Sequence, residues 1–195
     1  DTTEEDAFFE ERIHFFPEEL EELSKLKSRK RREWLSSRYL LHVLSEREIR
    51  GACVKDSFGK PFLQDSHFHI SISHSDDFTA VIGSPHSCGI DIQKWVTKID
   101  RIASRFIGES EWAYIPVSDC LSYYHALWGA KEAIYKSYGK KSVDFRSDME
   151  VAPFVFDPSG FFFEGILKKD NSVKNYSLFC RQIDQLILVY AIQKS

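Results

Sequence analysis

Residues 128–136 read Trp-Gly-Ala-Lys-Glu-Ala-Ile-Tyr-Lys, and this segment predicts an α-helix. Within it, Trp128, Glu132 and Lys136 recur every four residues, so their side chains share one face of the helix. A glutamate and a lysine at this spacing usually form an exposed ion pair worth about 0.3–0.5 kcal/mol. Whether Glu132 and Lys136 form a surface pair or part of a functional site therefore depends on which residues the fold places beside that face.

A strand is predicted earlier in the chain, where residues 89–93 read Gly-Ile-Asp-Ile-Gln. Strand side chains alternate between two faces, which places Asp91 and Gln93 on the same face. Residues 68–73 alternate apolar and polar side chains and predict another strand, and residues 78–82 predict a third.

Helices are predicted before these strands. Pro17 suits the first turn of a helix, and the leucines and Trp34 that follow recur near helical spacing. Ser45, followed three residues later by Glu48, predicts the start of a further short helix that Gly51 would end.

The second part of the chain repeats this order of elements. It contains two predicted helical stretches, around 99–106 and 121–138, and then predicted strands around 151–156, 161–164, 176–182 and 186–192. The sequence therefore predicts an α+β fold with two halves, residues 1–87 and 88–195, in which the similarity concerns element order alone.

The composition indicates a protein with a sizeable core and no membrane segment. Hydrophobic residues make up 43% of 195 positions, and no run approaches the roughly 18 apolar residues that a membrane helix needs. The four cysteines form no C-x-x-C pair, which argues against a zinc or redox motif. We therefore expect a soluble cytoplasmic protein with reduced thiols.

The net charge of -4 conceals an asymmetry. Residues 1–22 carry ten acids and one base, Arg12, whereas the remainder of the chain carries 25 basic and 20 acidic residues, a balance of +5. Six of the eight residues in 25–32 are cationic. Such a run either binds a polyanionic ligand or an acidic partner, or forms a solvated helix face.

Taken together, the Gly89-Ile90-Asp91 strand, the helix at 128–136 and the Ile72-Ser73-His74-Ser75 segment resemble the 4'-phosphopantetheinyl transferase family. The hallmarks of that family are a Gly-x-Asp strand followed by a Trp-x-x-Lys-Glu-x-x-x-Lys helix. The resemblance implies transfer of the 4'-phosphopantetheine group of coenzyme A to a serine of an acyl or peptidyl carrier protein, with release of 3',5'-ADP.

Three further segments resemble the longer, surfactin-synthetase-activator type of this family. These are Arg38 with its following leucines, the turn Gly59-Lys60-Pro61, and Arg105-Phe106-Ile107. This resemblance implies a pseudo-dimer of two α/β halves within one polypeptide. It also implies a monomer with the active site in the cleft between the halves.

The resemblance assigns catalytic roles to Asp91, Glu132 and Lys136. Asp91, Gln93 and Glu132 would bind Mg²⁺, with Mn²⁺ as a possible substitute, since such ions prefer oxygen ligands together with phosphates and waters. Glu132 would accept the proton of the carrier serine, directly or through a water, and Lys136 would stabilise the leaving phosphate.

The resemblance also assigns contacts with coenzyme A to Arg38, Lys60, Ser73, His74 and Lys131. Arg31 lies seven residues before Arg38 and so on the same helix face, and Lys25 belongs to the same basic run; both are further candidates for phosphate contacts, against ordinary surface charge. Coenzyme A and a carrier protein are the expected partners, without nucleic acid or membrane.

Two positions depart from the family pattern. Gln93 stands where many members have a second carboxylate ligand, and Gly129 replaces a residue that is usually a small hydroxyl. These departures leave open a protein that binds coenzyme A or a carrier without catalysis, and a magnesium-dependent phosphodiesterase. The carrier, its pathway and the tolerance for acyl-coenzyme A are not identified by the sequence.

Overall fold

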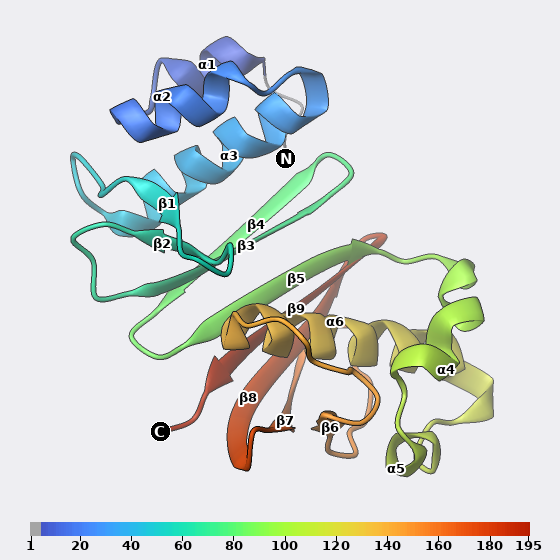
Figure 1. The fold of residues 1–195 in the computed structure, drawn as a ribbon. Coiled ribbons are helices and arrows are strands. Elements are labelled where there is room, and N and C mark those ends of the chain that lie inside the picture. Colours follow the sequence, from blue (N-terminus) through green and yellow to red (C-terminus); the bar gives the residue numbers. More distant parts are fainter. Residues whose placement is uncertain (1–4) are drawn as a thin grey trace.

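The computed structural model describes residues 5–195, so residues 1–4 of the acidic opening segment lie outside it. The chain has the predicted α+β fold, with two antiparallel sheets and helices packed on each (Figure 1). No helix within 5–195 combines the length and the apolar character that crossing a membrane requires.

The first sheet has the strand order β1-β2-β3-β4 and is covered by the N-terminal helices (Figure 1). The elements of this half are α1 (Asp6–Glu10), α2 (Pro17–Ser24), α3 (Ser28–Ser45), β1 (Cys53–Lys55), β2 (Pro61–Leu63), β3 (His69–Ser75) and β4 (Phe78–Ser84). The longest helix, α3, buries Trp34, Leu35 and Leu41 toward its neighbours.

The second sheet has the strand order β5-β9-β8-β7-β6, and α6 lies across one face of it (Figure 1). Its strands are β5 (Cys88–Lys94), β6 (Met149–Val151), β7 (Phe161–Lys169), β8 (Ser172–Ile183) and β9 (Leu186–Gln193). Between β5 and β6 the chain forms η1 (Thr97–Ile102), α4 (Ala103–Phe106), α5 (Glu109–Trp112), η2 (Val117–Asp119) and α6 (Cys120–Tyr138).

The largest core lies between α6 and the second sheet, where Leu127, Ile134 and Val189 are fully buried. Gly89 allows β5 to approach α6 unusually closely, because a Cβ at this position would lie 1.9 Å from the carbonyl oxygen of Ala133. This contact places the residues that follow Gly89 on β5 against the helix face that carries the predicted site.

Two serine side chains of β3 join the first sheet to the second. Ser71 Oγ accepts a hydrogen bond from the Ile90 amide, and Ser73 Oγ accepts one from the Ile92 amide, each at 3.1 Å. The edge strand β5 of the second sheet therefore meets side chains of β3, an interior strand of the first sheet. The boundary at residues 87 and 88 stays a prediction, as does the pseudo-dimeric relation of the halves, whose sheets have four and five strands.

Two local predictions are wrong. The short helix expected after Ser45 does not form, because Glu46 has a left-handed backbone with φ of 52° that ends α3, and turns follow it. The strand expected at 151–156 ends at Val151 instead. Pro153 and Pro158 follow, and proline has no N–H to donate to a strand ladder.

Candidate active site

Three side chains from three separate elements meet where the two sheets join. Lys136 Nζ on α6 donates to Asp91 Oδ1 on β5 at 2.8 Å and to Ser73 Oγ on β3 at 2.8 Å. It also donates to the Ile90 carbonyl oxygen at 2.9 Å. The structure thus brings together Asp91, Lys136 and Ser73, which the sequence analysis had assigned to one site.

Glu132 lies one turn before Lys136 on α6 and belongs to the same cluster. Burial, together with the negative charge of Asp91, raises the pKa of its carboxyl to about 7, and the positive charge of Lys136 partly offsets both effects. A carboxyl with this pKa is suited to accept a proton near neutral pH. The helical pair expected between Glu132 and Lys136 is replaced by the pair of Lys136 with Asp91.

The carboxylates of Asp91 and Glu132 fit a divalent cation. Asp91 is 7% exposed, and within residues 5–195 its Oδ2 atom has no hydrogen-bond partner. A cation would satisfy this oxygen and reduce the repulsion between the two carboxylates. Within the same residues no group of three or more His, Cys, Asp or Glu side chains forms a complete site. Two carboxylates with phosphate oxygens and waters suffice for Mg²⁺.

Gln93 makes a different contact from the one predicted. Its Nε2 donates to the His125 carbonyl oxygen at 3.1 Å, and its Oε1 lies 3.0 Å from His125 Nδ1. His125 Nε2 in turn lies 3.0 Å from the Val96 amide nitrogen and 3.1 Å from the Val96 carbonyl oxygen. Both ends of the Gln93 amide are thus engaged with α6.

His125 was missed by the sequence reasoning. Its position seven residues before Glu132, on the same face of the helix, was the available signal. Gly129 lies between them and leaves room for the amide, since a Cβ there would lie 3.1 Å from Gln93 Nε2 and 2.6 Å from Val189 Cγ2. The two departures from the family pattern, Gln93 and Gly129, are therefore in contact with each other.

Lys131 does not face the cluster, and the prediction that it contacts coenzyme A is wrong. Its side chain is 0% exposed, because one residue along a helix turns the side chain by about 100° away from Glu132. Its Nζ donates to Glu111 Oε2 at 2.6 Å and to the carbonyl oxygens of Phe106 and Phe145. Lys131 is a buried structural residue.

A cavity of about 150 Å³ opens beside Lys136 and contains residues of both halves. Lys60, Lys140 and Lys141 line it together with Lys136. Lys60 Nζ donates to the Ser137 carbonyl oxygen at 2.5 Å, and burial lowers the pKa of this lysine. This cavity therefore has a high density of cations, which suits a diphosphate, and Lys136 links it to the carboxylate of Asp91.

A second cavity of about 280 Å³ adjoins the first, because Pro61 and Ile72 line both. Lys30, Arg38, Lys55 and His74 also line this second cavity. We refer to the two cavities together as the cationic groove.

His74, Lys25 and Arg31 were also predicted to contact coenzyme A, but only His74 lines the cationic groove. Burial lowers the pKa of His74 to about 4, so its ring is neutral at neutral pH and contacts a phosphate only as a hydrogen-bond donor. Lys25 pairs with Glu21 at 2.7 Å on the surface, and Arg31 bonds Asp6 at 3.1 Å. Among the described residues, neither Lys25 nor Arg31 lines the cationic groove.

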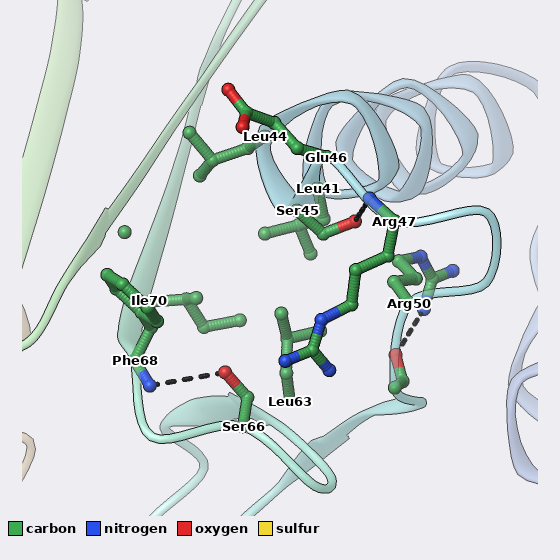
Figure 2. A pocket seen from close by; sticks show the side chains of 12 residues that line it. Leu41, Leu44, Ser45, Glu46, Arg47, Arg50, Leu63, Ser66, Phe68 and Ile70 are labelled. Atoms are coloured by element: carbon green, nitrogen blue, oxygen red, sulfur yellow. Dashed lines mark hydrogen bonds between the residues drawn. The ribbon is translucent and has the colours of Figure 1, made fainter.

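A separate cavity of about 370 Å³ lies between the C-terminal end of α3 and the first sheet (Figure 2). Leu41, Leu63 and Ile70 form its apolar floor, and the Arg47 side chain extends over it (Figure 2). It contains none of Asp91, Glu132 and Lys136, and it shares neither Pro61 nor Ile72 with the cationic groove, so it does not belong to the candidate active site.

A sequence model of the 4'-phosphopantetheinyl transferase superfamily matches residues 87–182. The 4'-phosphopantetheinyl transferase gsp of Aneurinibacillus migulanus is 35% identical to the chain over 112 residues, which cover 55% of this chain and 46% of that protein. The chain thus spans about half the length of the curated relative that it matches. The family match includes Asp91, Glu132 and Lys136, and it ends before β9.

Proposed function

Because the chain belongs, through residues 87–182, to the 4'-phosphopantetheinyl transferase superfamily, we propose that it transfers the 4'-phosphopantetheine group of coenzyme A to a serine of an acyl or peptidyl carrier protein. The strongest support is the meeting of Asp91, Glu132 and Lys136 beside a cationic groove. One polypeptide supplies both sides of the first cavity, so we propose a monomeric enzyme.

In the proposed reaction, the serine oxygen forms a bond to the phosphorus that carries pantetheine, and the bridging bond of the diphosphate breaks to release 3',5'-ADP. Glu132 accepts the serine proton and later loses it to solvent. Lys136 places its ammonium group against the charge that develops on the leaving phosphate. Mg²⁺ or Mn²⁺, when bound by Asp91 and Glu132, supplies further positive charge to the diphosphate.

The proposal predicts a defined change of mass. Incubation of the purified chain with coenzyme A, Mg²⁺ and an apo carrier protein should give a carrier heavier by one phosphopantetheine, measured by intact-mass spectrometry. The panel should contain carriers from fatty-acid, polyketide and peptide synthesis, with a chelator-treated reaction as control. Coenzyme A binding without any mass gain would favour a non-catalytic binding protein. Release of 3',5'-ADP without a carrier would favour a phosphodiesterase.

Substitutions of Asp91 and Gln93 should weaken metal binding to different extents, and this difference can be measured without turnover. Asp91→Asn should weaken Mn²⁺ binding by at least about 100-fold, the upper end of what even an indirect metal partner contributes. Gln93→Met should change it by less than about three-fold, because the Gln93 amide already bonds His125. Paramagnetic resonance of Mn²⁺ with coenzyme A present measures both. Equal losses in the two variants would make Gln93 a direct ligand.

A further inference from the structure

The cavity between the C-terminal end of α3 and the first sheet is lined by residues that the proposed reaction does not use (Figure 2). Its volume of about 370 Å³ falls within the range of small-molecule sites. Its floor of Leu41, Leu63 and Ile70 is buried, whereas Leu44 and Phe68, which also line it, are 44% and 54% exposed. The cavity therefore offers an apolar surface that the hydrocarbon part of a ligand would cover.

A cation without a carboxylate partner lies over this floor. Figure 2 shows the Arg47 side chain extending across the cavity toward Ser66, while the carboxylate of Glu46 points away from it. Within residues 5–195, the Arg47 guanidinium forms no ion pair, and the hydrogen bond of Arg47 to Ser45 Oγ at 3.4 Å comes from its backbone amide. A carboxylate placed over the floor would therefore meet an unpaired positive charge.

Arg50 adds an unsatisfied donor to the lining of the same cavity. It is 2% exposed, and its terminal nitrogens donate to the Glu19 carboxylate at 2.8 and 3.0 Å and to the Gly51 carbonyl oxygen at 2.9 Å. Its Nε atom has no hydrogen-bond partner among the described residues. A buried donor without an acceptor is uncommon in folded proteins. Because Glu19 neutralises Arg50, the net positive charge of the cavity comes from Arg47.

Gly83 on β4 provides part of the open space. It pairs with Ile70 on β3 in an antiparallel register, and residues directly opposite each other in such a pair point to the same face of the sheet. A side chain at position 83 would therefore enter the cavity beside Ile70, and its Cβ would lie 3.1 Å from Leu44 Cδ2. The lack of a side chain at this position keeps the cavity open.

We propose that this cavity binds an aliphatic carboxylate, whose hydrocarbon chain covers the apolar floor and whose carboxylate pairs with Arg47. The apolar lining suits the chain, and a single unpaired guanidinium suits a single carboxylate. This site does not depend on the proposed function. Ile70 also borders the first cavity of the cationic groove, so the variants that test the site are chosen to separate the two.

Octanoate is the probe, and calorimetry of the full chain measures its affinity. Hexanoate should bind about ten-fold more weakly, because it covers less of the floor by two methylene groups. Arg47→Met should weaken octanoate binding by about ten-fold and change the affinity for 1-octanol by less than about two-fold, since only octanoate carries the charge. Lys140→Met removes a cation from the cationic groove instead, so it should leave octanoate binding unchanged.

Gly83→Val provides an independent arm, because its side chain fills the cavity from the sheet and should weaken binding of octanoate and of 1-octanol alike, by at least about ten-fold. No saturable octanoate binding by the unmodified chain would overturn the proposal, as would unchanged binding by Gly83→Val. Equal losses in Arg47→Met and Lys140→Met would place the carboxylate in the cationic groove. If Gly83→Val does not fold, the comparison of octanoate with 1-octanol on Arg47→Met still decides the outcome.

Discussion

Replacing Glu132 with glutamine should lower the rate of phosphopantetheine transfer by about 10²–10⁴-fold, the usual contribution of a positioned proton acceptor. Glutamine has the same shape but cannot accept the serine proton. The raised pKa of Glu132, caused mainly by burial, makes the carboxyl a base that matches neutral pH. Single-turnover transfer to an apo carrier, followed by intact mass, measures the effect.

The control is a glutamate at a distance from the cluster. Glu164 is exposed and pairs with Lys194 on the second sheet, so Glu164→Gln should transfer at the normal rate. Coenzyme A binding of Glu132→Gln should stay within about three-fold of the original value, because Lys60, Lys136 and the second cavity remain. Transfer by Glu132→Gln at the normal rate would remove Glu132 from the role of proton acceptor.

Replacing Lys131 with methionine should destabilise the fold by about 3–5 kcal/mol, because it leaves the Glu111 carboxylate buried without its cation. Glu111 also accepts hydrogen bonds from the Gly108 and Val151 amides, so the change affects the whole region around α5 and β6. Urea unfolding followed by circular dichroism measures the free energy of unfolding.

Lys136→Met is the matched comparison, since the same replacement occurs on the same helix at a partly exposed position. We expect it to keep most of the stability and to lose transfer activity. Adding Glu111→Gln to Lys131→Met removes the unpaired charge and should restore part of the lost stability. A Lys131→Met variant that keeps its stability but binds coenzyme A poorly would instead support the ligand contact first predicted for Lys131.

Local patterns in the sequence predicted the elements that form the site. Alternation in residues 68–73 and 89–93 predicted parts of β3 and β5, and the spacing in 128–136 predicted the face of α6 that carries Glu132 and Lys136. These predictions succeeded because the side chains of each segment follow a single repeat, of two residues in the strands and about 3.6 in the helix. The short β1 and β2 were not predicted, since three residues give too little pattern to distinguish a strand from a turn.

Side-chain partners could not be predicted in the same way. Lys131 and Glu132 are adjacent in the sequence, yet one ends in the core and the other at the site, and only the position of Glu111 in the folded chain decides this. The bond between Gln93 and His125 likewise joins residues 32 positions apart. Which side chains contact each other depends on tertiary packing, and no repeat in the sequence reveals it.

The two serines that join β3 to β5 bear on how the groove admits a ligand as large as coenzyme A. Ser71 Oγ receives the Ile90 amide, and Ser73 Oγ receives the Ile92 amide as well as Lys136 Nζ. A water molecule can take the place of a backbone partner in either link. Separating the halves slightly at this seam therefore leaves the strand pairing within both sheets intact. The apolar cluster of Ala80, Ile90, Ile92 and Leu186, which contains residues of both sheets, opposes such a separation.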